Sequence, residues 1–97
     1  MKTAYAIGHI LVLDEDKWAQ YCAQVPATVA PWGGELLLRG KKVRVLSGKY
    51  PKTDTVVVRF PDIESAHGWF DSPAYQALIP LRDQGASVDL VAFEGSD

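Results

Sequence analysis

Residues 54–83, DTVVVRFPDIESAHGWFDSPAYQALIPLRD, decide the fold, because they read as an interior strand that leads directly into an interrupted helix. The β-branched and aromatic run 56–60 is too short for a helix, and Pro61 ends it because proline cannot donate to a sheet ladder. Asp62 then supplies an N-cap, and Ser72-Pro73 repeats the start signal. We therefore predict a strand followed by a helix that kinks near residue 72 and resumes.

The apolar positions of this helix recur with helical spacing and predict one core-facing stripe. The stripe consists of Ile63, Ala66, Phe70, Ala74, Ala77, Leu78 and Leu81. Trp69, Tyr75 and Arg82 lie off it. Because positions seven apart lie nearly above one another on a helix, we expect the Tyr75 hydroxyl and the Arg82 guanidinium on one flank. That flank is the first candidate site.

Length and composition predict a single domain, residues 1–97, of ordinary globular character, with 47% hydrophobic and 23% charged residues. The net charge of −2 argues against a general role on nucleic acid or membrane surfaces. No apolar stretch approaches the ~20 residues of a membrane span. One cysteine, Cys22, permits no internal disulfide, and no cleavage site follows the N-terminal apolar run. These features favour a cytoplasmic protein.

The first predicted strand, residues 3–13, is apolar on both faces. Tyr5, Ile7, His9, Leu11 and Leu13 alternate with Ala4, Ala6, Gly8, Ile10 and Val12. A sheet with one face in water would alternate apolar and polar residues. Helices on both sides or a second subunit must therefore cover the second face.

Residues 14–16, Asp-Glu-Asp, provide a cap and an acidic first turn for a helix over the next stretch. Pro26 is expected to kink this helix, Pro31 to weaken its last turn, and Gly33-Gly34 to end it. Its apolar positions recur at helical spacing and predict the buried stripe. They are Trp18, Tyr21, Cys22, Val25, Val29 and Trp32.

Residues 34–40, GELLLRG, read as a strand with Leu36 and Leu38 on one face and Arg39 on the other, followed by a turn into a short extension, KVRVLSG, at 42–48. From Arg39 to Lys52 there are six basic residues and no acid. Three interpretations stay open: a solvated, lysine-protected sheet edge, which is favoured, a surface that steers an anionic ligand, or contact with nucleic acid. No interleaved surface aromatics support the last.

The last predicted strand, residues 87–95, follows Gly85-Ala86 and is again largely apolar on both faces. The element order is thus β-α-β-β-α-β. This order predicts an α+β, ferredoxin-like fold, an antiparallel sheet with two helices on one face. Two such sheets that face each other in a homodimer would cover the second, apolar face.

Nearly the whole chain resembles an uncharacterised bacterial family, domain of unknown function 1330. The resemblance rests on a set of short motifs that are weak singly and specific together. They are Trp32-Gly33-Gly34, Arg39-Gly40, Phe60-Pro61, Trp69-Phe70, Ser72-Pro73-Ala74-Tyr75-Gln76 and Arg82. The chain departs from the family at Ser47-Gly48, where Glu-Gly is common, so no acid–base role of that glutamate carries over. The resemblance implies a dimeric α+β barrel, whose relatives include cofactor-free monooxygenases, lactone isomerases and haem-dependent enzymes.

Arg39, Tyr75 and Arg82 are the first candidate ligand-binding residues, since two guanidiniums and a phenol suit a carboxylate or enolate. Trp69, Tyr21 and Trp32 would supply apolar walls, and Ser72 a further polar contact. The alternative is an intrachain network in which the arginines pair with Glu35, Asp71 or Asp83.

His9 and Tyr75 are the candidate catalytic residues, His9 as a general base or a hydrogen-bond donor in the pocket. The alternative for His9 is a hydrogen-bonded interior histidine at a dimer interface. His9, His67 and scattered acids lack metal-site spacing, so we expect no metal and no cofactor such as haem. Cys22 is expected to pack in the core rather than to act as a nucleophile.

Two functions therefore compete. The first is a homodimer that binds a small organic acid, or turns it over without a cofactor, in a pocket between sheet and helices. The second is a non-catalytic dimerising module. An RNA-binding role lacks the aromatic pair that it would need on the central strands.

Overall fold

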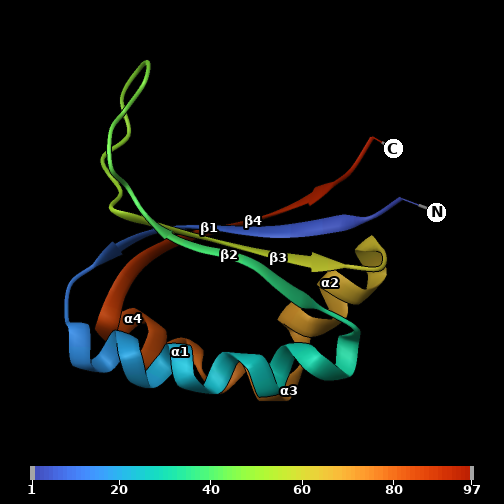
Figure 1. Cartoon of the computed structure of the whole chain (residues 1–97). Coiled ribbons are helices and arrows are strands. Elements are labelled where there is room, and N and C mark those ends of the chain that lie inside the picture. The colour runs from blue at the N-terminus through green and yellow to red at the C-terminus, as the bar shows by residue number, and fades with distance from the viewer. Residues whose placement is uncertain (1, 97) are drawn as a thin grey trace.

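The structure is a computed structural model that describes residues 2–96. Its four strands are β1 (Ala4–Val12), β2 (Glu35–Lys41), β3 (Asp54–Phe60) and β4 (Ala86–Glu94). They form one antiparallel sheet in the order β2-β3-β1-β4. All helices lie on one side of this sheet (Figure 1). The predicted ferredoxin-like α+β architecture is confirmed.

The first helical segment is α1 (Glu15–Val29), which is capped by the Asp14 carboxylate and continues through Pro26. A 3-10 turn, η1 (Ala30–Trp32), follows it. Gly33 then takes the left-handed conformation with φ 69°, as the Gly-Gly signal predicted.

The second helical region breaks twice, not once as predicted. It consists of α2 (Ile63–Asp71), α3 (Pro73–Gln76) and α4 (Ile79–Gly85). Ser72 makes the first break and caps α3 through its hydroxyl. The second break precedes Pro80, which has no N–H to continue the hydrogen-bond pattern.

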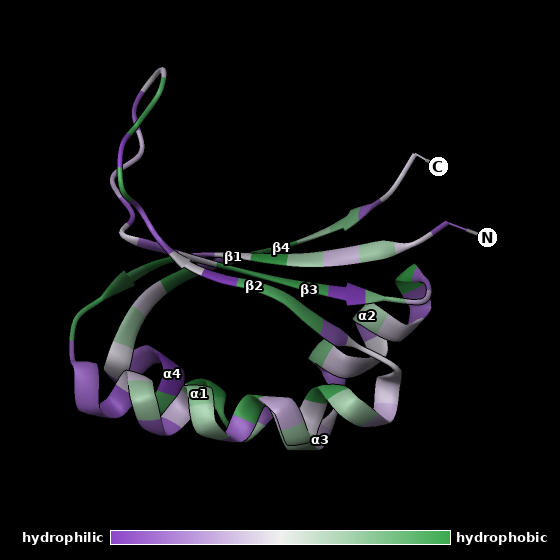
Figure 2. Cartoon of the chain, in the orientation of Figure 1, coloured by the Kyte–Doolittle hydropathy of each residue, from purple (hydrophilic) through white to green (hydrophobic). Residues whose placement is uncertain are grey.

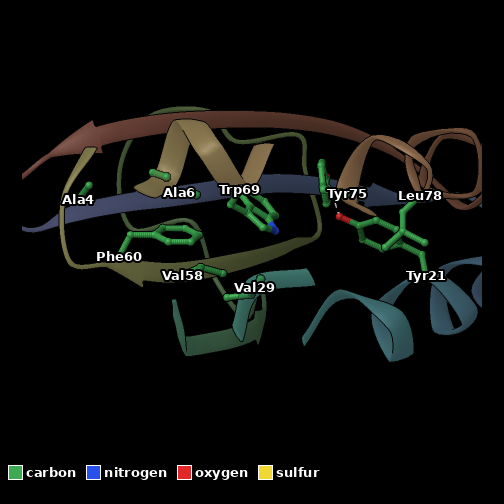
Figure 3. Packing of buried hydrophobic residues seen from close by; sticks show 10 residues of the cluster. Ala4, Ala6, Tyr21, Val29, Val58, Phe60, Trp69, Tyr75 and Leu78 are labelled. Carbon is green, nitrogen blue, oxygen red and sulfur yellow. Dashed lines mark hydrogen bonds between the residues drawn. The ribbon is translucent and has the colours of Figure 1, made fainter. Parts of the chain in front are cut away.

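The buried residues also differ from the predicted stripe. Ala74 and Ala77 are exposed and Phe70 is partly exposed, whereas Trp69 is only 3% exposed and belongs to the core. Figure 3 shows Trp69 among the clustered core side chains, with Phe60 on one side and Tyr75 on the other. The ring centroids lie 5.5 Å from Phe60 and 4.3 Å from Tyr75.

Strand β2 contains a bulge that the sequence did not reveal. The register shifts between Leu36, which pairs with Val58, and Leu38, which pairs with Val57. Because alternate residues of β3 face opposite ways, Leu36 and Leu38 lie on opposite faces, and Arg39 lies on the face that the helices cover. The predicted sharing of a face by Leu36 and Leu38 is therefore wrong.

The predicted extension at 42–48 does not form a strand. Residues 42–53 instead form a long loop without regular structure, which rises from the face of the sheet opposite the helices (Figure 1). We call residues 42–53 the arm, and we call the face from which the arm rises the helix-free face. Within residues 2–96, no helix has the length and apolar character needed to cross a membrane.

Candidate functional site

A cavity of about 140 Å³ lies between α1 and the helix-covered face of the sheet. Strands β1, β3 and β4 form its floor, and Trp18 and Trp69 stand in its walls. Its lining is almost entirely apolar. The other lining residues are Ala6, Gly8, Ile10, Tyr21, Cys22, Val25, Pro26, Val29, Ala30, Gly34, Leu36, Arg39, Val56, Val58, Val88 and Leu90.

Two glycines of the cavity lining, Gly8 in β1 and Gly34 just before β2, are closely packed. A Cβ atom on Gly8 would lie 2.8 Å from Val56 Cγ1, and one on Gly34 would lie 2.8 Å from Phe60 Cε1. Both positions therefore exclude larger side chains unless their neighbours shift. Ala6 lies on the same face of β1 as Gly8, and both residues line the cavity. Small side chains on this face of β1 thus leave space below α1.

Within residues 2–96, Arg39 is the only charged residue of the cavity lining. The β2 bulge turns its side chain toward α1, where Nη2 donates a long hydrogen bond of 3.4 Å to the Cys22 carbonyl. Arg39 is exposed and has no carboxylate partner within residues 2–96. Its other guanidinium donors are therefore free to bind an anion at the edge of the cavity.

The two other titratable groups of the cavity lining, Tyr21 and Cys22, are neutral at physiological pH. Burial, together with the neighbouring Tyr75, raises the pKa of the Tyr21 phenol. Burial also raises the pKa of the Cys22 thiol, against the lowering effect of Arg39. Among the described residues, the lining contains no histidine and no carboxylate. The cavity therefore offers an apolar space and a cation, and no general base at neutral pH.

Tyr75 and Arg82 lie behind Tyr21 and do not line the cavity. The Tyr75 and Tyr21 hydroxyl oxygens are 2.8 Å apart, and Arg82 Nη1 donates to the Tyr75 oxygen over 3.2 Å. This bond confirms the expected shared flank, although the helix between the two residues is broken. Arg82 Nε also donates to Asp83 over 3.1 Å. The predicted alternative for Arg82, an intrachain pair with Asp83, is what the structure contains.

The other predicted wall and contact residues have structural partners. Trp69 lines the cavity, and its indole Nε1 donates to the Thr28 hydroxyl over 3.0 Å. The Ser72 hydroxyl donates to the Trp69 carbonyl and accepts from the Tyr75 amide. Trp32 packs against Gly68 of α2, and a Cβ atom on Gly68 would contact the Trp32 ring. The structure thus brings Tyr21, Trp69 and Arg39 to the cavity, and places Ser72 and Trp32 elsewhere.

His9 lies on the helix-free face, on the other side of the sheet from the cavity. Its Nδ1 is 3.0 Å from the Tyr50 hydroxyl at the base of the arm. The other histidine, His67, is exposed on α2 beside a separate hollow of about 170 Å³. Within the described part of the chain, no group of three or more histidine, cysteine, aspartate or glutamate side chains could hold a metal ion.

Sequence reasoning missed that Gly8, Trp18 and Leu90 belong to the cavity. One signal was available, since Ala4, Ala6 and Gly8 follow one face of β1 and are all small. A face of small residues under a helix that presents large side chains leaves unfilled volume between them.

Solved structures with the same fold share little sequence with this chain. A protein of unknown function from Rhodopseudomonas palustris, RPA0582, has a TM-score of 0.81 at 11% identity, over 99% of this chain and 84% of its own. A dimeric ferredoxin-like protein of unknown function from Jannaschia sp. CCS1 has a TM-score of 0.78 at 11% identity, over 96% and 99%. SnoaB, a cofactor-independent oxygenase from Streptomyces nogalater, has a TM-score of 0.71 at 10% identity, over 100% and 96%.

At these identities, the neighbours show the fold alone. A search of curated proteins finds no significant match to the sequence. The sequence profile of one family covers residues 3–96, which is nearly the whole chain. The protein therefore belongs to the DUF1330 family, a domain of unknown function.

Proposed function

We propose that the protein is a homodimer that binds a small organic acid in the cavity between α1 and the sheet. The apolar body of the ligand fills the cavity, and its carboxylate meets Arg39. One observation carries this proposal: an apolar cavity with Trp18 and Trp69 in its walls has a single arginine at its edge, and no carboxylate pairs with that arginine within residues 2–96.

The volume of the cavity sets the size of the ligand. An apolar protein cavity of about 150 Å³ accepts benzene. The cavity here, at about 140 Å³, therefore suits one ring or a short branched chain. A polycyclic molecule would require the walls to move.

The lining supports binding rather than acid–base catalysis. SnoaB is a cofactor-independent oxygenase with this fold, so cofactor-free turnover is the natural enzymatic alternative. Such chemistry on an acidic C–H or O–H group needs a base that is ionised at the working pH. The raised pKa values of Tyr21 and Cys22 leave both groups protonated. His9 is on the opposite face of the sheet, and Tyr75 is behind Tyr21.

A second candidate is a dimerising module without a ligand, and the helix-free face favours it. Register places Leu38, Val57, Ile7 and Val91 in one apolar row across all four strands. Val91 is 42% exposed and Phe93, farther along β4, is 47% exposed. A homodimer would cover this row, and the Jannaschia neighbour is described as dimeric. Both candidates therefore share the dimer and differ in the cavity.

Tryptophan fluorescence tests the cavity directly, because Trp18 and Trp69 line it. Benzoate and benzyl alcohol have the same ring and differ in the anionic group. We expect the wild type to bind benzoate about tenfold more tightly than benzyl alcohol, because one charged hydrogen bond contributes about that much to the affinity. Arg39→Met keeps the aliphatic stem and should remove this preference while benzyl alcohol still binds.

Three results are informative. A benzoate preference that survives in Arg39→Met would show that Arg39 is not the anion-binding group. Binding of neither probe would contradict the cavity proposal and leave the dimerising module as the function. A monomer in sedimentation, with 10.6 kDa instead of about twice that mass, would contradict the dimer in both candidates.

A further inference from the structure

The arm, residues 42–53, carries large apolar side chains into solvent. Val43 is 97% exposed and Leu46 is 82% exposed. The arm rises on the helix-free side, and the end of β4 curves toward the same side (Figure 1). Figure 2 shows hydrophobic and hydrophilic stretches following one another along it. Apolar side chains that lie close together on the surface mark a contact site when they form one patch.

Side chains and backbone groups fix the base of the arm to the sheet. Tyr50 bonds to His9, and Lys52 reaches across to β4, where it pairs with Asp89 at 3.4 Å and donates to Ser87 at 3.1 Å. The Thr53 amide donates to the Ile10 carbonyl over 2.8 Å. The base therefore crosses one end of the helix-free face, and this anchoring sets the direction in which the tip projects.

An open groove of about 670 Å³ lies between the arm and the helix-free face. Leu38 and Thr55 form its floor, and Val45 and Leu46 form the wall on the arm. The groove adjoins the apolar row of Leu38, Val57, Ile7 and Val91. A partner that covers this row would thus meet the arm at its edge.

The charge of the arm is complementary to the rest of the same chain. The arm, residues 42–53, holds four of the ten cations and no acid. The remaining residues hold six cations and all twelve acids. The rest of a second copy therefore carries the net negative charge that the basic arm would attract.

We infer that the arm clasps a second copy of this chain, with Val43 and Leu46 packed on the partner and the arm cations beside its acidic side chains. This inference rests on the proposed homodimer and adds the contact between the arm and the second copy. By symmetry each copy contributes one arm, so the two clasps act on the same dimer.

A nucleic acid is the other partner that a basic arm could bind, and the arm is poorly built for one. Binding of single strands relies on aromatic side chains that stack on bases. The only aromatic residue of the arm is Tyr50, and it packs edge-on against His9 with 5.7 Å between the ring centroids. Val43 and Leu46 would also have no apolar group to pack against on a phosphate backbone.

Sedimentation velocity over a dilution series tests the clasp by comparing the dimer dissociation constants of the wild type and of the double variant Val43→Ser/Leu46→Ser. Both side chains are exposed in the single chain, so their loss should leave its fold intact. We expect the dimer dissociation constant to rise about tenfold or more. Ser47→Ala, on the same arm, is the matched control and should leave it unchanged.

Carbodiimide crosslinking of mixed ¹⁴N and ¹⁵N protein tests the contact itself. Lys42 or Lys49 should be joined to an acid of the other isotope. Unchanged dimer affinity in the tip variant, or arm crosslinks only within one chain, would overturn the clasp while the dimer stands. A monomeric wild type would overturn the homodimer as well. Polyuridylate binding that depends on the arm lysines, without an effect on dimer affinity, would assign the arm to nucleic acid instead.

Discussion

At the scale of single residues, the most consequential group is the buried chain of Tyr21, Tyr75 and Arg82. Tyr75 is fully buried, and its hydroxyl joins the phenol that lines the cavity to a guanidinium near the surface. Within residues 2–96, every buried side-chain nitrogen or oxygen has a hydrogen-bond partner. This network fixes the position of Tyr21, because loss of the Tyr75 hydroxyl would leave the buried Tyr21 hydroxyl without its partner.

The raised pKa of Tyr21 predicts how stability changes at alkaline pH. Unfolded tyrosine loses its proton near pH 10, whereas the folded protein holds it, so the unfolded state gains relative stability as pH rises through 10. The difference in unfolding free energy between wild type and Tyr21→Phe should stay constant below about pH 9 and then shrink, by at most about 1.4 kcal/mol per pH unit. Urea unfolding at pH 7 to 11 measures it. A difference that stays constant up to pH 11 would contradict the buried-phenol interpretation.

Some site residues could be predicted from the sequence and others could not, for identifiable reasons. Tyr75 and Arg82 were expected on one flank and are hydrogen-bonded there. Residues seven positions apart still meet although the helix breaks between α3 and α4. Trp69 was expected off the core stripe as a wall of the site, and it both lines the cavity and belongs to the core. Arg39 was expected beside the other two, and the cavity instead separates it from them.

At the scale of elements, local signals located the four strands and the starts of α1, α2 and α3, but they missed the start of α4 and the effects of long-range contacts. The caps at Asp14, Asp62 and Ser72 all accept hydrogen bonds from the backbone, as their residue types predicted. The bulge in β2 depends on how this strand pairs with β3, which no local pattern records. The arm is anchored by contacts with β1 and β4, far away in the sequence.

The packing of η1 on α2 gives a prediction at this scale. A Cβ atom on Gly68 would lie inside the contact distance of the Trp32 ring, so Gly68→Ala should force the two elements apart. We expect a loss of about 1–3 kcal/mol in unfolding free energy, with a red shift of tryptophan emission as Trp32 gains solvent.

Gly40→Ala is the matched control, because its Cβ atom would stay 3.5 Å or more from Leu38 and Thr55. Its effect should remain within about 0.5 kcal/mol of the wild type. Equal effects of the two substitutions would mean that the Gly68 contact does not constrain the fold.

At the scale of the whole molecule, the two faces of the sheet have separate tasks. The helix-covered face holds the core and the cavity, while the helix-free face holds an apolar row and the arm. The sequence anticipated this division, since β1 and β4 are apolar on both faces. Ligand binding and dimerisation should therefore be separable by substitution, because they use opposite sides of the same strands.

Val91→Asp tests that separation. Val91 is exposed on the helix-free face, and Ala92, the next residue of β4, is exposed on the other face without lining the cavity. A charge at Val91 would have to be buried unpaired in the dimer, which costs several kcal/mol per site, so we expect a monomer at micromolar concentration.

Ala92→Asp places the same charge on the same strand and should leave the dimer intact. Benzoate should bind Val91→Asp with wild-type affinity, because β4 reaches the cavity through Val88 and Leu90. If both variants stay dimeric, the copies associate through another surface, and the apolar row is not the interface. If Val91→Asp loses benzoate affinity together with the dimer, the partner completes the cavity, and ligand binding and association are one function.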